Sequence, residues 1–220
     1  ADLLGHVSLW SQTATCHMSP KYMQVVSSTF SPQGGIFAIG SGNGLIHVYD
    51  TCKQHLHRVL SGYQEAVTSV LFHPNCAYLA SLSIEPTVRL WDLRLAETVR
   101  LFVGQPQRNS ALAFSNNGKL MAVFDGELQV FDVGSQRTMM SKELFGGSGG
   151  EVVVNLHFSA GDRFVYAVGM NGGIVACEIK GDEEGRVSEV YRVNERVISS
   201  ELLQAEEFRI VTTREDDEQI

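Results

Sequence analysis

The sequence predicts an all-β fold in which one small four-stranded unit is used several times. A hydrophobic phrase recurs around Phe30, Phe72, Phe114 and Phe158, with spacings of 42, 42 and 44 residues. A second phrase recurs in step with it, and its core position falls at Trp10, Tyr49, Trp91, Phe131 and Cys177, with spacings of 39, 42, 40 and 46 residues. No segment carries a sustained helical period, so the repeated unit is expected to consist of strands.

Residues 25–60 show how one unit is organised. Apolar runs at 25–30, 36–39 and 45–49 and a more polar run at 55–60 are separated by turns rich in Gly, Asn and Pro. Four strands of about five residues joined by such turns are what a four-stranded antiparallel sheet requires. The polar fourth run suits an outer edge strand in contact with water.

The same division continues along the chain. It predicts strands at 66–72, 78–82, 88–91 and 98–102, at 110–114, 120–124, 128–131 and 138–144, and at 152–158, 164–168, 174–178 and 187–193. Residues 6–10 and 13–18 are expected to be the last two strands of a further unit, and residues 197–203 and 208–212 the first two strands of another.

A period of roughly 40–45 residues with a terminal Trp-Asp is typical of the WD40 β-propeller. We therefore expect one propeller domain over residues 1–220, with complete repeats at about 20–60, 61–102, 103–144 and 145–193. Partial blades are expected at 1–19 and 194–213, and a solvated acidic tail at 214–220.

Closure of the propeller ring has two solutions. An exposed inter-blade face would uncover on the order of 500 Å² of apolar surface, roughly 12 kcal/mol, which is comparable to the whole stability of a domain. The first and last strand pairs can together make one blade of a closed five-bladed ring. Alternatively, the chain forms the C-terminal blades of a seven-bladed ring. The start at Ala1, inside a unit, favours the seven-bladed alternative.

The composition argues against two classes of protein. No stretch reaches 18 apolar residues, so no membrane span is expected. A net charge of −8 argues against direct nucleic-acid binding, which needs a concentrated basic surface. The cysteines at positions 16, 52, 76 and 177 lack regular spacing and are expected to be reduced residues of an intracellular protein.

Three patterns have a chemical interpretation that the surrounding sequence does not support. Ser148 lies in a Gly-X-Ser-X-Gly pattern, but a strained strand-to-helix turn with His and acid partners is not expected there. Residues 40–44 resemble a phosphate loop without the Lys-Ser/Thr or the helix that such a loop needs. Cys52, His55 and His57 lack a fourth metal ligand. The sequence therefore predicts a non-enzymatic protein with no cofactor and no metal.

Loops on one rim are the expected docking surface for protein partners. Propellers commonly bind there, and Tyr and Arg are favoured binding residue types. The candidate partner-binding residues are Tyr63, Gln64, Glu85, Gln105, Arg108 and Asp125.

The hydrogen-bond tetrad of WD repeats joins a Gly-His histidine, a Ser or Thr, a turn Asp and the Trp. Gly62-Tyr63, Gly104-Gln105 and Gly146-Gly147 stand where Gly-His is expected. Asn43, Glu85, Asp125 and Asn171 stand where the turn Asp is expected. These departures predict repeats that are held together by packing more than by the polar network.

The phrase from Phe72 to Asp92 carries a more specific likeness. This phrase resembles the WD40 subunits of the TBP-associated factor family, which serve TFIID and SAGA. It reads Phe-His-Pro-Asn-Cys-Ala-Tyr-Leu-Ala-Ser at 72–81 and Thr-Val-Arg-Leu-Trp-Asp at 87–92. The truncated last unit also fits this family, whereas Glu85, Phe131 and Cys177 depart from its pattern. The resemblance implies a nuclear scaffold that contacts histone-fold TBP-associated factors. The alternative is a generic WD40 adaptor in ubiquitin ligation, RNA processing or trafficking.

Overall fold

The computed structural model describes residues 7–10, 15–18, 24–53, 55–85, 87–103, 111–145, 152–180, 186–192, 196–202 and 208–213. The chain forms two compact units, residues 1–108 and residues 109–220. All of the regular secondary structure in the described ranges is β-strand. The predicted all-β class is therefore confirmed.

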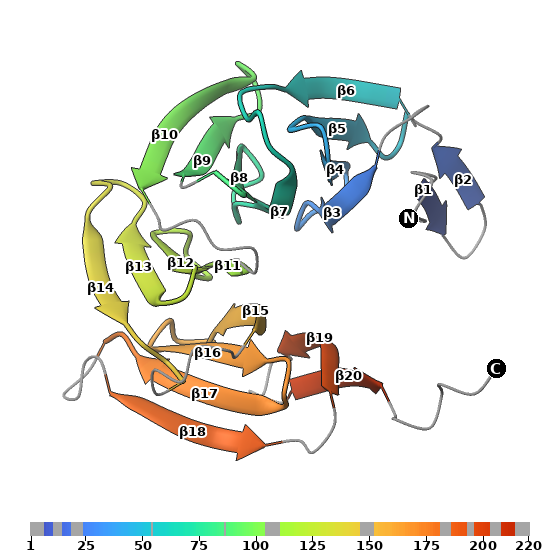
Figure 1. The fold of residues 1–220 in the computed structure, drawn as a ribbon. Coiled ribbons are helices and arrows are strands. Elements are labelled where there is room, and N and C mark those ends of the chain that lie inside the picture. The colour runs from blue at the N-terminus through green and yellow to red at the C-terminus, as the bar shows by residue number, and fades with distance from the viewer. Residues whose placement is uncertain are drawn as a thin grey trace. The chain divides into compact units, whose positions relative to one another are not determined.

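The unit of residues 1–108 contains a strand pair and two four-stranded antiparallel sheets (Figure 1). The pair is β1 (Val7–Trp10) with β2 (Thr15–Met18). The first sheet has the order β3 (Val25–Phe30), β4 (Ile36–Ser41), β5 (Ile46–Asp50) and β6 (His55–Leu60). The second has the order β7 (Val67–Phe72), β8 (Tyr78–Ser83), β9 (Thr87–Asp92) and β10 (Glu97–Val103).

The unit of residues 109–220 repeats this arrangement with two four-stranded sheets and a strand pair. The sheets are β11 (Ala111–Phe114), β12 (Leu120–Phe124), β13 (Leu128–Asp132) and β14 (Thr138–Lys142), then β15 (Val153–Phe158), β16 (Phe164–Gly169), β17 (Gly173–Glu178) and β18 (Val187–Arg192). The pair is β19 (Arg196–Leu202) with β20 (Phe208–Thr213). Each predicted strand agrees with the observed one to within two residues at either end.

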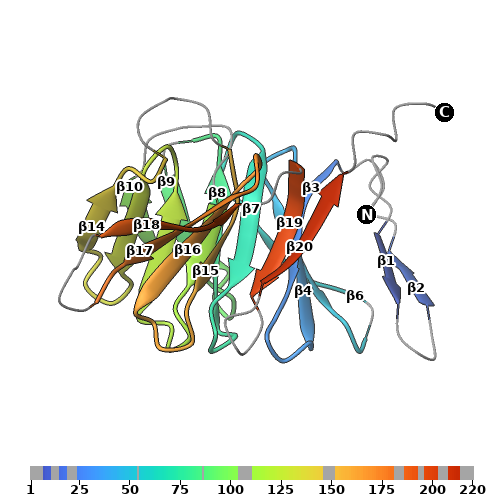
Figure 2. The same cartoon turned by 90° about the horizontal axis from the view of Figure 1, so that it is seen from below.

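In each sheet every strand pairs with its sequence neighbour, so the turns gather at the two ends of the strands (Figure 2). Three sheets shift register near the start of the first strand, between Val25 and Ser27, Val67 and Ser69, and Val153 and Asn155. A β-bulge at the same place in three of the four four-stranded sheets is a sign of one repeated unit. The four sheets are consistent with WD40 propeller blades, and the number of blades in a ring stays a prediction.

The acid after the aromatic position caps the turn that follows the third strand. Asp92 Oδ1 accepts the N–H groups of Arg94 at 2.8 Å and of Leu95 at 3.3 Å. These backbone hydrogen bonds lower the pKa of Asp92. Asp50 and Asp132 accept N–H groups of their own turns in the same way, from Lys53 and Ser135. The Asp of each Trp-Asp-like phrase thus closes a turn by a local side-chain to backbone bond.

The aromatic positions of the third strands are buried in all four sheets. Tyr49, Trp91, Phe131 and Cys177 are all buried. Cys177 is fully buried at the position that Trp91 holds two units earlier, as predicted. Burial raises the pKa of the Cys177 thiol to about 11, so this cysteine is a small apolar residue of the core.

Candidate functional site

The candidate site lies at the turn between β6 and β7, residues 61–66, next to the turn between β8 and β9. A Cβ added at Gly62 would lie 2.6 Å from Nη1 of Arg89 and 3.1 Å from the Trp91 ring, so the turn packs closely on both side chains. The missing side chain lets two side chains of β9 reach the turn. The sequence pattern Gly62-Tyr63 is therefore explained by close packing beneath it.

A buried hydrogen-bond network connects this turn to the core of the β7–β10 sheet. The Tyr63 hydroxyl donates to the Ser81 carbonyl oxygen at 2.8 Å and lies 3.1 Å from Ser81 Oγ. Trp91 Nε1 donates to the same Ser81 Oγ at 2.8 Å. Tyr63 therefore stands in for the histidine of the WD tetrad. A polar network therefore persists in this repeat, because a phenol can donate and accept as an imidazole can.

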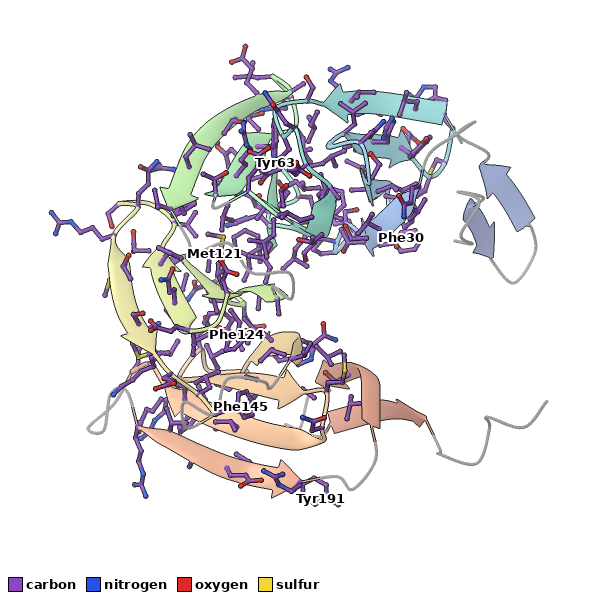
Figure 3. All side chains as sticks on the ribbon, in the orientation of Figure 1. Phe30, Tyr63, Met121, Phe124, Phe145 and Tyr191 are labelled. Carbon is purple, nitrogen blue, oxygen red and sulfur yellow. The ribbon has the colours of Figure 1, made fainter. Side chains whose placement is uncertain are left out.

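Tyr63 is a structural residue rather than an exposed contact. Its side chain is 6% exposed, and Figure 3 shows it among the side chains of the β7–β10 sheet. Burial raises the pKa of Tyr63 to about 12, so the hydroxyl stays protonated at neutral pH. Its hydrogen bonds to Ser81 connect the 61–66 turn to the β7–β10 sheet.

Arg89 covers the buried pair from the solvent side. Its guanidinium carbon lies 4.5 Å from the Tyr63 ring centroid and 5.9 Å from that of Trp91, within the range of cation–π attraction. Its Nη2 lies 3.7 Å from Oε2 of Glu85. A partly buried cation is thus held over two aromatic rings by a carboxylate of the adjacent turn.

Glu85 joins the two turns. Its Oε1 accepts the N–H groups of Gln64 and Glu65, at 2.5 and 3.4 Å. In the tetrad this position belongs to an Asp, and the longer Glu side chain here bonds the backbone of the 61–66 turn. Gln64 and Glu65 are exposed, so their side chains project from a turn whose backbone is held in place.

The structure brings three of the six predicted site residues together. Tyr63, Gln64 and Glu85 form one cluster, whereas Gln105 and Arg108 lie outside the described residues. Asp125 belongs to the unit of residues 109–220, in the turn between β12 and β13, where its backbone N–H donates to the Glu127 carbonyl.

Sequence reasoning missed Arg89 and Ser81. Arg89 lies two residues before Trp91, which places both side chains on one face of β9, and this spacing was an available signal. Ser81 lies ten residues before Trp91, at the partner position of the tetrad, so the spacing was intact although one residue type had changed.

Ser148, in the Gly-X-Ser-X-Gly pattern, falls outside the described residues. Within the described ranges, no three His, Cys, Asp or Glu side chains cluster with metal-binding geometry, so Cys52, His55 and His57 do not converge. In the same ranges no helix is long and apolar enough to cross a bilayer.

Comparisons with known proteins agree with the sheet architecture. Residues 54–92, from β6 to the end of β9, match the family described as WD domain, G-beta repeat. The chain is 29% identical over 142 residues to Transcription initiation factor TFIID subunit 5 of Caenorhabditis elegans, covering 62% of this chain and 22% of that protein.

Two plant relatives have other names. The chain is 23% identical over 171 residues to Pre-mRNA-processing factor 19 homolog 2 of Arabidopsis thaliana, covering 77% of this chain and 32% of the relative. It is 38% identical over 87 residues to E3 ubiquitin-protein ligase COP1 of the same plant, covering 39% of this chain and 13% of the relative. The chain thus spans less than a third of the length of each of these three relatives.

Proposed function

We propose that this WD40-repeat chain is a non-enzymatic scaffold of a nuclear transcription complex of the TFIID or SAGA kind, and that it binds other protein subunits. The observation that carries the proposal is the pre-organised turn pair in which Glu85 holds the backbone of Gln64 and Glu65. A surface that is already ordered loses little conformational entropy when a partner binds.

The composition of the turn pair supports protein recognition. Gln64 and Glu65 supply exposed amide and carboxylate groups, and Arg89 supplies a partly exposed guanidinium over Tyr63. An arginine surrounded by polar groups is typical of protein-binding surfaces. The partners expected on this proposal are histone-fold TBP-associated factors, and the expected location is the nucleus.

The transcription assignment is supported by the phrase from Phe72 to Asp92 and by the TFIID subunit 5 relative. A second candidate function is a WD40 adaptor in RNA processing or ubiquitin ligation. The names of the two plant relatives favour this second candidate.

Affinity capture from nuclear extract separates these assignments. The 220-residue chain should recover histone-fold TBP-associated factors in identified, stoichiometric amounts. Recovery of spliceosomal or cullin-type ligase subunits in their place would select the second candidate. Recovery of neither class would contradict both.

Charge reversals test the surface itself. Glu65→Lys should lower the recovery of the partner severalfold, because this side chain is exposed on the turn pair. Glu97→Lys on β10 is the matched control, since Glu97 is also exposed and lies away from this turn. Equal losses in the two variants would assign the effect to net charge and would remove the turn pair as the docking site.

A further inference from the structure

A second surface feature lies in the unit of residues 1–108, between the β3–β6 and β7–β10 sheets. It is a cavity of about 370 Å³, bounded partly by the turns that follow β7 and β9. These turns lie at the ends of the strands opposite to the Tyr63 turn. The volume is near the lower end of the range of about 300–1,000 Å³ for ligand pockets, so it suits a short segment rather than a folded domain.

The floor of this groove is apolar. Ile36 and Val48 from the first sheet and Leu93 from the second line it. Val48 and Leu93 are buried in the core between the two sheets, so the floor is rigid. An aliphatic side chain that enters the groove would gain contact with carbon atoms and leave water.

The rim of the groove is basic. His57, Arg58 and Arg94 line it, and the side chain of Arg94 is 79% exposed. Nη1 of Arg58 donates to the neutral His57 carbonyl oxygen at 3.2 Å, and no carboxylate pairs with Arg58 in the part of the chain that the structure describes. Arg94 Nη2 lies 3.5 Å from Asp92, whose carboxylate already accepts two backbone N–H groups of its turn.

This local cationic rim contrasts with the net charge of −8 of the whole chain. Guanidinium groups pair well with carboxylates because their donors match the two oxygens. A nucleic acid fits less well, since phosphate binding needs an extended basic surface and the remaining chain repels a polyanion.

We propose that this groove binds a short acidic peptide segment of a protein partner. An aliphatic side chain of the peptide enters the cavity over Val48 and Leu93, and carboxylates on either side of it pair with Arg58 and Arg94. The site is separate from the Gln64 and Glu65 surface. It does not depend on which complex the chain belongs to.

Fluorescence polarisation with labelled peptides tests the groove. The probe is a fluorescein-labelled Glu-Asp-Leu-Asp-Glu peptide added to the full 220-residue chain. Saturable binding is expected, and it should weaken as salt is raised. A neutral analogue with Gln and Asn, and an acidic analogue with Gly in place of Leu, should each bind about tenfold more weakly.

Charge variants show whether the arginines of the rim bind the acidic peptide. Arg58→Glu should weaken binding of the acidic probe about tenfold or more, and Arg94→Gln by a smaller factor. Arg137→Glu is the control, because it makes the same charge change on an exposed turn of the unit 109–220. Equal weakening by Arg58→Glu and Arg137→Glu, no saturable binding, or full competition by duplex DNA would each overturn the proposal.

Cys76 offers a second measurement on the unaltered chain. Its half-buried side chain lines the groove, whereas Cys52 is exposed and does not line it. Saturating acidic peptide should slow alkylation of Cys76 by iodoacetamide severalfold and leave Cys52 unchanged, as read by peptide mass mapping. Unchanged labelling of Cys76 in the presence of bound peptide would place the peptide elsewhere and overturn the proposal.

Discussion

Phe30 and Phe72 occupy the same position in successive repeats, 42 residues apart, yet Phe30 is 51% exposed and Phe72 only 3%. Phe72 packs in the core between the β3–β6 and β7–β10 sheets. Phe30, labelled on β3 in Figure 3, lies 4.6 Å from the Phe37 ring and keeps half of its surface open. In a repeat architecture the stability of a unit depends on its neighbours, and these two rings differ in what covers them.

The first prediction compares truncation of these two rings. Phe72→Ala should lower the free energy of unfolding by about 3–5 kcal/mol, because it leaves a cavity in a packed core. Phe30→Ala should cost less than about half of that, since the ring already meets water. Denaturant unfolding of both variants measures the difference. Equal costs would mean that another sheet covers Phe30 in solution, as ring closure predicts.

The second prediction concerns Ser81, which connects Tyr63 to Trp91. Ser81→Ala removes the acceptor of the Trp91 indole N–H and leaves that donor buried without a partner. Such a loss costs about 1–3 kcal/mol of stability. Ser141→Ala is the control, because its hydroxyl bonds Glu127 on the exposed surface, and it should change stability little. Thermal unfolding followed by circular dichroism gives the comparison, and equal melting temperatures of the two variants would contradict it.

The third prediction is a loss of stability at high pH caused by Tyr63. Burial raises its pKa to about 12, against about 10 in the unfolded chain. Below pH 10 the phenol is protonated in the folded and the unfolded chain, and Tyr63 makes its full contribution to the free energy of unfolding. Between about pH 10 and 12 the unfolded chain releases the proton first, so the free energy of unfolding falls, by roughly 3 kcal/mol in total.

Tyr63→Phe should remove this part of the fall in the free energy of unfolding at high pH. It should also lower the free energy of unfolding by about 1 kcal/mol at neutral pH, because the hydrogen bonds of the hydroxyl are lost. Tyr191→Phe controls for other tyrosines, because Tyr191 is 62% exposed on β18. Denaturant unfolding at a series of pH values checks the result. A Tyr63→Phe variant with the same slope above pH 10 as the unaltered chain would refute the assignment to Tyr63.

The strands were predictable because their signals are local. Residues 36–39 and 78–82 alternate or cluster apolar side chains between Gly, Asn and Pro turns, and such patterns depend on near neighbours. The burial of Cys177 was predictable for the same reason, since the repeat gives its position whatever the side chain is.

The candidate site was only partly predictable. The sequence placed Gln64 and Glu85 in loops of one rim, and in the structure the Glu85 carboxylate accepts the backbone N–H of Gln64. Tyr63 was expected at the surface because turn residues are usually exposed, but its ring enters the core to reach Ser81. The basic groove was not predictable, because Arg58 and Arg94 come from different repeats and only the packing of two sheets brings them to one cavity.

The fourth prediction concerns Gly44, in the turn between β4 and β5. Its φ of 81° is in the left-handed region, and a Cβ there would lie 2.5 Å from the carbonyl oxygen of Tyr63. Gly44→Ala should therefore cost about 2–5 kcal/mol, through backbone strain together with a clash against main chain.

Gly34 is the matched control for this clash. Its φ is 73°, but no atom lies within 4 Å of the position of an added Cβ. Gly34→Ala carries the backbone strain alone, offset in part by a less flexible unfolded chain, so its cost should be about 1 kcal/mol or less. Denaturant unfolding ranks the two variants. Since the clash at Gly44 pushes on the Tyr63 turn, Gly44→Ala should also lower partner recovery in the capture experiment, whereas Gly34→Ala should not. Equal behaviour of the two variants would show that the 61–66 turn yields freely, which would contradict a rigid docking surface.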